Sequence, residues 1–309
     1  MAGIISTSLE KIIQVSPDFK ELLLLICLLD SQNIPKSFLE SYKEASVVEQ
    51  FLYSLRKHAL ITHEFSIGQK KSSHTFSLHR STQSIGLIFF KSLLPDNEKG
   101  IFFDKLSTCI NKLNIFEKKD CDYKKLLLPH FEALIKKLPD MGISNALRDR
   151  CTGDLLLPIG DIYRRCLGHL LLSKQYLSRL FSTDAYYKHM KPSTLALLLK
   201  TLGGVCVDLG ELEEGITYCR KSITFCDNTH EFRIVKAENM KVIGVAYSEK
   251  NDFEKAKNCY EKALNTLPED DNSLRKREAE AEIYIQLASL YSKTYINRKE
   301  AYQAEKYIL

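Results

Sequence analysis

Apolar residues recur with a helical period in the first third of the chain. Ser16-Pro17 is typical of a helix start, and residues 17–29 are apolar on nearly every face, which predicts a buried helix. Ile34-Pro35 opens a short second helix. Ser46-Val47-Val48-Glu49 has the form of a capping box, and it predicts a third helix over about 47–58.

The pattern then changes to alternation. Residues 60–65 and 75–79 alternate between apolar and polar side chains around a polar turn, which predicts a β-hairpin. A helix over about 82–94 follows. Farther along, the lysine-rich stretch 112–137 predicts two solvated helices, around residues 126–128 and 131–138.

The C-terminal half repeats one pattern of small and bulky residues. Its clearest copy has the spacing of two helices: Met240, Ile243, Gly244, Tyr247, Ala256, Tyr260, Ala263 and Pro268. The small residues Gly244 and Ala256 allow two antiparallel helices to approach closely, while Pro268 ends the second helix. This copy closely resembles a tetratricopeptide repeat, which is a helical hairpin.

Looser copies flank the clear one. The small residues Gly160, Gly203, Gly244 and Ala288 recur at intervals of 43, 41 and 44 residues. In the last copy the first helix centres on Ala288, and the pattern resumes after about four inserted residues at Ala301, Ala304 and Ile308. The spacing predicts a solenoid of about four helical hairpins, the last one incomplete.

The whole order of elements resembles the STAND-type signalling ATPases, in which an NB-ARC nucleotide-binding module precedes a winged helix and tetratricopeptide repeats. Besides the repeats, four motifs carry the resemblance: Leu29-Asp30 with Ile34-Pro35, Leu52-x-x-Leu55 leading into Ala59-Leu60-Ile61, the segment Phe76-Ser77-Leu78-His79-Arg80-Ser81-Thr82-Gln83, and Leu127-Leu128-Pro129-His130.

The resemblance implies that the winged helix packs on a nucleotide module and that His79 approaches the nucleotide phosphates. The sequence contains no Gly-x-x-x-x-Gly-Lys-Ser/Thr motif, so it would supply only the regulatory and sensor half of such a protein. The residues alone favour a simpler role for His79, as a hydrogen-bonded residue at the end of a strand.

We therefore expect a mainly α protein. A winged-helix-like domain with one β-hairpin occupies residues 1–95, a helical connector 96–145, and an α-solenoid of tetratricopeptide-like repeats 146–309. With 44% hydrophobic and 27% charged residues the chain is globular, and its longest apolar run, residues 22–29, is far below the roughly 20 residues of a membrane helix.

Composition favours a cytoplasmic protein. The nine cysteines form no Cys-x-x-Cys pair, and most of them fall in apolar helical patterns, as expected of reduced core thiols. The abundance of lysine and asparagine would suit an intracellular bacterium that delivers proteins to a host cell.

Motifs for catalysis are incomplete. His63-Glu64 and His230-Glu231 both begin a zinc-protease helix motif, but isoleucine stands at the position of the second histidine in each. We predict no catalytic residue, no metal and no cofactor. An enzyme with an unrecognised site is the least favoured interpretation.

Nucleic-acid binding is an alternative because winged helices often bind DNA. The phosphate contacts would come from Arg56 on the third helix, Lys70 and Lys71 in the hairpin turn, and His79. These few cations neutralise too few phosphates, and the net charge is only +5, so a protein-docking role is favoured.

The repeats point to a peptide or protein ligand. In a solenoid of helix pairs the first helices line the groove. The groove candidates are Arg164, Arg165, Lys200, Glu238, Lys241 and Ser248. Arg164, Lys200 and Lys241 would form a positive ladder for an acidic peptide or a carboxylate. Ordinary groove charges without a dedicated ligand remain an equal alternative.

The leading interpretation is thus a non-enzymatic protein-interaction, scaffold or sensor module that binds a peptide or protein in the repeat groove. A DNA-binding regulator that uses the repeats as a sensor, and a fragment of a STAND signalling ATPase, are the alternatives. The ligand and the oligomeric state are open.

Overall fold

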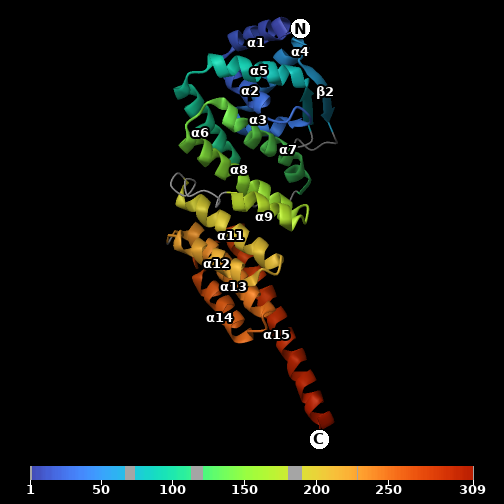
Figure 1. The fold of residues 1–309 in the computed structure, drawn as a ribbon, viewed down its shortest axis with the longest axis vertical. Helices are drawn as coiled ribbons and strands as arrows, with labels where there is room; N and C mark the ends of the chain where they lie inside the picture. The colour runs from blue at the N-terminus through green and yellow to red at the C-terminus, as the bar shows by residue number, and fades with distance from the viewer. Residues whose placement is uncertain (1, 67–73, 113–120, 180–189, 228, 309) are drawn as a thin grey trace. The chain divides into compact units, whose positions relative to one another are not determined.

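The computed structural model describes residues 2–66, 74–112, 121–179, 190–227 and 229–308, and it is mainly helical (Figure 1). The chain divides into two compact units, Met1–Leu167 and Gly168–Leu309. In the part of the chain that is described, no helix is both long enough and apolar enough to span a bilayer.

The first unit is built around one buried helix. Its helices are α1 (Ala2–Val15), α2 (Pro17–Leu28), α3 (Lys36–Tyr42), α4 (Ala45–Lys57), α5 (Arg80–Leu93), α6 (Asp96–Lys112), α7 (Cys121–Lys137), the short 3-10 helix η2 (Leu138–Met141) and α8 (Asn145–Arg165). The predicted start of α2 is confirmed, because the Ser16 side chain accepts a hydrogen bond from the Asp18 amide at 3.3 Å. Apolar residues on every side of α2 are buried against α1, α5 and α7.

The predicted hairpin is confirmed and gains a third strand. Strands β2 (Ile61–Ser66) and β3 (His74–Leu78) pair antiparallel, and β1 (Ile34–Pro35) pairs with the other edge of β3. Phe76 of β3 is completely buried and lies opposite Ile34 of β1. The order of helices and strands from α2 to α5 is the one that a winged helix requires, although that assignment stays a prediction.

Ion pairs replace the predicted capping box of α4. The helix begins at Ala45, one residue before the predicted cap, and Glu44 at the N-cap position makes no side-chain cap. Glu49 instead pairs with Lys36, which also lies 3.2 Å from Glu40. The capping-box prediction was wrong, since the Glu49 carboxylate finds a cation of α3 rather than a backbone amide.

The first unit also corrects the prediction of two helices around Pro129. Helix α7 continues through Pro129, which is exposed. The backbone carbonyl that loses its partner there belongs to Lys125, one turn earlier and also exposed, so water can satisfy it. The boundary between units falls after α8, whereas the sequence pattern places the start of the solenoid at residue 146.

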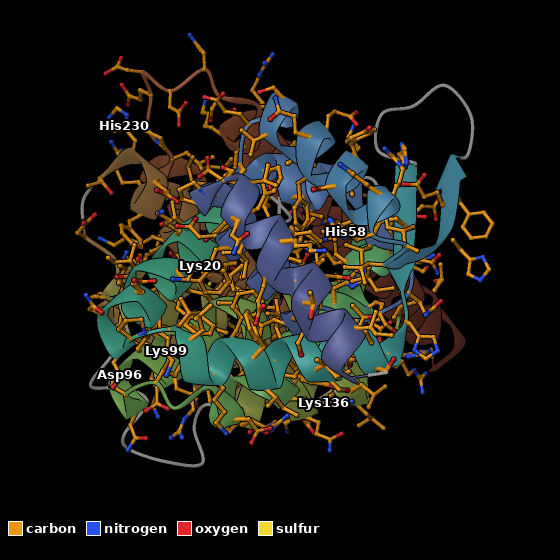
Figure 2. The ribbon with its side chains drawn as sticks, turned by 90° about the horizontal axis from the view of Figure 1, so that it is seen from above. Lys20, His58, Asp96, Lys99, Lys136 and His230 are labelled. Carbon is orange, nitrogen blue, oxygen red and sulfur yellow. The ribbon has the colours of Figure 1, made fainter. Side chains whose placement is uncertain are left out.

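Several ion pairs lie within the first unit. Lys124 of α7 lies 3.6 Å from the buried Asp161 of α8 and so ties these two helices together. At the start of α6, Lys99 lies 3.2 Å from Asp96, and both are labelled in Figure 2. Lys20 of α2 lies 2.7 Å from Glu98.

The second unit stacks helical hairpins. Its helices are α9 (Leu170–Ser178), α11 (Pro192–Asp208), α12 (Leu212–Thr224), α13 (His230–Glu249), α14 (Phe253–Thr266) and α15 (Leu274–Ile308). The pairs α11/α12 and α13/α14 have the most extensive contacts. The turns inside these two hairpins contain Gly210 and Asn251, both at positive φ and 41 residues apart.

Small residues lie where paired helices meet, as the repeat pattern predicts. A Cβ atom at Gly244 would stand 2.5 Å from the Tyr260 ring of α14, and one at Gly203 would stand 2.5 Å from the Cys219 sulfur of α12. Buried clusters then join successive hairpins: Val207 and Ile216 pack with Ile243, and Tyr260 packs with Ile283.

The last repeat differs from its prediction. Helix α15 runs without a break for 35 residues, so the turn expected before Ala301 is absent. Figure 1 shows α15 continuing past the ends of α13 and α14.

Candidate functional site

The first helices of the repeats, α11, α13 and α15, lie side by side and carry a row of ion pairs. Lys200 of α11 donates a hydrogen bond to Glu238 of α13 at 2.7 Å, and Arg275 of α15 approaches the same carboxylate at 3.6 Å. We call this the first-helix surface and define it by the following residues: Lys200, Glu238, Lys241, Arg275, Glu282 and Ile285.

Glu238 is the centre of the row. Its side chain is 21% exposed. Burial acts to raise the pKa of its carboxyl group, but the charges of Lys200 and Arg275 outweigh burial and lower the pKa to about 2. Glu238 is therefore ionised at neutral pH and pairs with one cation from each neighbouring helix, Lys200 of α11 and Arg275 of α15.

Lys241 is held more loosely. It pairs with Glu282 of α15, whose side chain is 59% exposed. Ile285, one turn farther along α15, is 63% exposed. This part of the surface therefore presents both polar and apolar side chains to solvent. The carboxylate of Glu282 pairs with Lys241, and Ile285 lies one turn away.

The structure brings together only part of the predicted peptide site. Lys200, Glu238 and Lys241 belong to one row, whereas Ser248 is only 7% exposed. Arg164 and Arg165 lie at the end of α8 in the first unit, where Arg165 pairs with Asp161 at 2.8 Å. The partners Arg275 and Glu282 were missed, because sequence spacing does not show which acids of the next helix face a given lysine.

The candidates for phosphate contact in the first unit have internal partners where they are described. Arg56 makes a two-pronged hydrogen bond to Glu64 of β2, at 3.0 and 3.1 Å. His79 is the N-cap of α5, and its Nδ1 accepts a hydrogen bond from the Ser81 amide at 3.3 Å. Lys70 and Lys71 lie outside the described residues.

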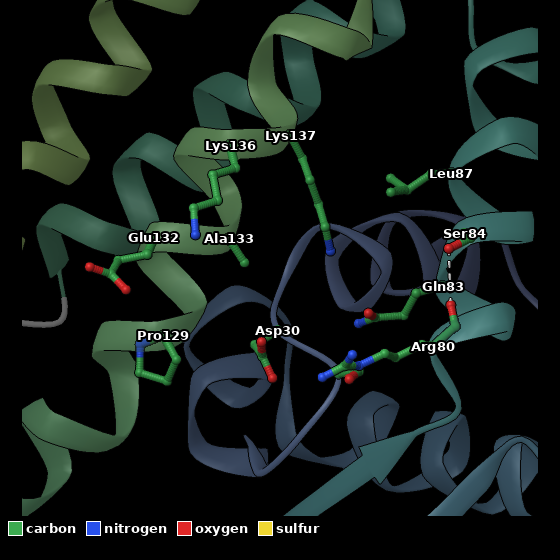
Figure 3. A pocket seen from close by; sticks show the side chains of 11 residues that line it. Asp30, Arg80, Gln83, Ser84, Leu87, Pro129, Glu132, Ala133, Lys136 and Lys137 are labelled. Atoms are coloured by element: carbon green, nitrogen blue, oxygen red, sulfur yellow. Dashed lines mark hydrogen bonds between the residues drawn. The ribbon is translucent and has the colours of Figure 1, made fainter.

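A cleft of about 340 Å³ opens in the first unit between the end of α2, the start of α5 and α7 (Figure 3). Gln83 and Lys137 point toward each other across it. Lys137 donates to the Cys27 and Leu29 carbonyls at 2.9 and 2.7 Å, and Gln83 donates to the Ile26 and Leu29 carbonyls. These two side chains cap the C-terminus of α2, so their role there is structural.

A second charged cluster joins α9 to the first hairpin, and the sequence pattern did not reveal it. Lys174 of α9 donates to Glu211 at 2.6 Å and to Glu214 at 2.8 Å, beside the buried Cys206. The two carboxylates raise the pKa of Lys174, and burial raises the pKa of Cys206 to about 12. The thiol is therefore neutral, and the ion pairs of Lys174 with Glu211 and Glu214 fasten α9 to the first hairpin.

Comparisons with known proteins agree with the repeat architecture. A tetratricopeptide repeat family model matches residues 193–269, which cover α11 to α14. No curated protein sequence matches the chain. The family match makes this segment a tetratricopeptide repeat segment, the type of fold that serves as a protein-interaction or sensor module.

Among solved structures, the chain is similar to a STAND signal transduction ATPase with a tetratricopeptide repeat sensor from Pyrococcus horikoshii. The two are 16% identical, with a TM-score of 0.25, over 88% of this chain and 53% of the other. The chain thus spans about half the length of that protein.

Proposed function

We propose that the protein is a non-catalytic recognition module, and that it binds an acidic peptide or protein segment on the first-helix surface. The observation that carries the proposal is the row of cations on α11, α13 and α15, which are held in place by carboxylates of unequal exposure. A ligand carboxylate that replaces an exposed internal one keeps the charge balance of the surface.

Lys241 is the proposed anchor. Its partner Glu282 is 59% exposed, and an ion pair of that kind contributes about 0–1 kcal/mol, so a ligand carboxylate exchanges with it at little cost. Glu238 is too deeply held between Lys200 and Arg275 to be displaced in the same way. Exposed Ile285 offers an apolar contact beside the anchor.

In cellular terms we propose a cytoplasmic sensor segment of a STAND-type signalling protein. The winged-helix-like order of elements before the repeats supports this, as does the repeat segment itself. The 309 residues contain no phosphate-binding Gly-x-x-x-x-Gly-Lys-Ser/Thr motif, so their proposed contribution is recognition rather than ATP hydrolysis.

The test is fluorescence anisotropy with two peptides that differ only in having glutamates or lysines. We expect the glutamate peptide to bind and Lys241→Ala to weaken its binding about tenfold, the effect of losing one charge-assisted hydrogen bond. Glu282→Gln should strengthen binding, because it frees Lys241 from its internal partner.

Lys255→Ala is the matched control. Lys255 lies on α14, where it pairs with Asp252 at 2.6 Å and stands 5.5 Å from the Tyr247 ring, and it is not a residue of the first-helix surface. Equal effects of Lys241→Ala and Lys255→Ala would show that the peptide responds only to net charge, which would contradict the proposed surface.

A further inference from the structure

One side of the first half of α15 carries an exposed stripe of alternating small and aromatic residues. Ala281, Tyr284, Ala288 and Tyr291 recur at alternating intervals of three and four positions, which places them along one side of the helix. Tyr284 and Tyr291 are 55% and 54% exposed, and both alanines are exposed as well. We call these four residues the α15 stripe. None of them belongs to the first-helix surface.

The preceding repeat shows what this side of a first helix receives. Ala288 follows Gly244 of α13 by 44 positions. Gly244 meets the Tyr260 ring of α14, which a Cβ atom at Gly244 would approach to 2.5 Å. Helix α14 runs antiparallel to α13, because the two form a hairpin with a turn at Asn251. The equivalent occupant of the stripe is therefore a helix that runs antiparallel to α15 and places a tyrosine against Ala288.

A second copy of α15 has both properties. Gln286 lies midway between Tyr284 and Ala288, and also midway between Ala281 and Tyr291. When two copies of the helix pair antiparallel about a two-fold axis beside Gln286, Tyr284 of each lies opposite Ala288 of the other, and Ala281 opposite Tyr291. Every layer of the contact then combines one alanine with one tyrosine. A parallel pair would instead place tyrosine against tyrosine and alanine against alanine.

The residues that flank the stripe are compatible with the same register. On one flank Glu280 lies opposite Thr294 of the other copy, and Leu287 lies opposite Leu287 near the axis. On the other flank Glu278 lies opposite Ser292. No acidic residue among these faces another acidic residue, so like charges do not oppose the pairing there.

We propose that the α15 stripe joins two copies of the chain in an antiparallel two-fold dimer. Ile283 and Leu290, which pack α15 onto its own hairpins, lie on another side of the helix and keep their contacts. Each copy thus gives the other the kind of contact that α14 gives to α13, an aromatic ring against a small residue. The dimer interface continues the helix packing of the repeats.

The test is the mass of the full chain in solution, measured by light scattering after gel filtration over a wide range of concentrations. The wild-type protein is expected at twice the 35.5 kDa of one chain. Ala288→Glu and Tyr284→Lys each place an unpaired charge inside the contact. Each should raise the dissociation constant of the dimer by about tenfold or more.

An equimolar mixture of these two variants tests the register. In a mixed pair the two introduced charges have opposite signs and face each other, while the other contact of Tyr284 with Ala288 is unchanged. The mixture should therefore dimerise more tightly than either variant alone. Ser289→Arg is the control, because Ser289 is an exposed residue on a different side of α15. It should leave the dimer intact, and circular dichroism should show all variants as helical as the wild type.

Three results would overturn the proposal. The first is a wild-type chain that stays monomeric at every concentration. The second is a dimer that survives both Ala288→Glu and Tyr284→Lys, since the contact would then lie elsewhere on the molecule. The third is a mixture that dimerises no better than its two components, since Tyr284 and Ala288 would then not lie opposite each other.

Discussion

Individual small residues set how closely the repeat helices approach. At Gly203 an added Cβ would lie 2.5 Å from the Cys219 sulfur and 3.0 Å from the backbone oxygen of Gly215. A Cβ atom added at Gly215 would lie 2.9 Å from the backbone oxygen of Gly203. The two glycines therefore form a backbone-to-backbone contact between α11 and α12, which no side-chain rotation can relieve.

Gly203→Ala is expected to lower the free energy of unfolding by about 1–3 kcal/mol, the usual cost of overpacking a tight contact. Gly100→Ala is the control, because nothing lies within 4 Å of a Cβ at that helical position. There the substitution should change stability by no more than about 1 kcal/mol, in the stabilising direction that alanine favours in helices. Urea denaturation measures both, and equal stability of the two variants would contradict the proposed contact.

Glu238 links the stability of the repeats to pH. Glu238→Gln leaves Lys200 and Arg275 without their shared carboxylate, and the expected loss at neutral pH is roughly 1–3 kcal/mol. The folded pKa of about 2 lies below the ordinary value of 4.5. The contribution of Glu238 is therefore complete above about pH 4.5 and is lost as the pH falls toward 2.

Chemical denaturation of wild type and Glu238→Gln at several values between pH 7 and 3 measures this difference. The gap in unfolding free energy should narrow as the pH falls below 4.5. A gap that stays constant would show that the carboxylate is not held ionised by its neighbours. Glu282→Gln, at a 59% exposed position, should change stability by less than about 1 kcal/mol at any pH.

Secondary-structure elements were predictable where periodicity and tight packing coincide. The buried helix after Ser16, the hairpin and the two central repeat hairpins follow from pattern alone. The features that the sequence pattern did not predict depend on their surroundings in the folded protein. Strand β1 exists because Ile34-Pro35 pairs with β3. Helix α7 continues through Pro129 at an exposed turn, where water can satisfy the backbone carbonyl of Lys125.

The candidate site was predictable in part. Lys200 and Lys241 were identified from their places on the first helices, but their carboxylate partners depend on how successive repeats rotate against one another. The spacing of residues within one helix does not determine that rotation. For the same reason, the cluster of Lys174 with Glu211 and Glu214 became visible only in three dimensions.

Lys174 fastens α9 to the first hairpin, and this can be tested at the level of a helix. Lys174→Met removes both hydrogen bonds and should make the backbone amides of α9 exchange faster with deuterium. Because Lys174 is 25% exposed, the loss of global stability should stay below about 1 kcal/mol. Lys257→Met, which removes a loose 3.9 Å pair on α14, should leave the exchange of α9 unchanged.

The molecule as a whole combines two compact units with different properties. The first is built around the buried helix α2 and one small sheet, and its described candidates for phosphate contact, Arg56 and His79, have internal partners. The second is a stack of hairpins whose first helices carry paired charges with partial exposure. The net charge is only +5, and the proposal of a protein ligand rather than nucleic acid rests on this small excess of cations.

The most direct test of the proposed recognition surface is to map where an acidic ligand binds. A glutamate-rich peptide that carries a photoreactive group is cross-linked to the full chain, and mass spectrometry identifies the attached residues. We predict cross-links on α11, α13 and α15, concentrated around Lys241 and Ile285. Cross-links confined to α12, α14 or the first unit, or none at all, would contradict the account.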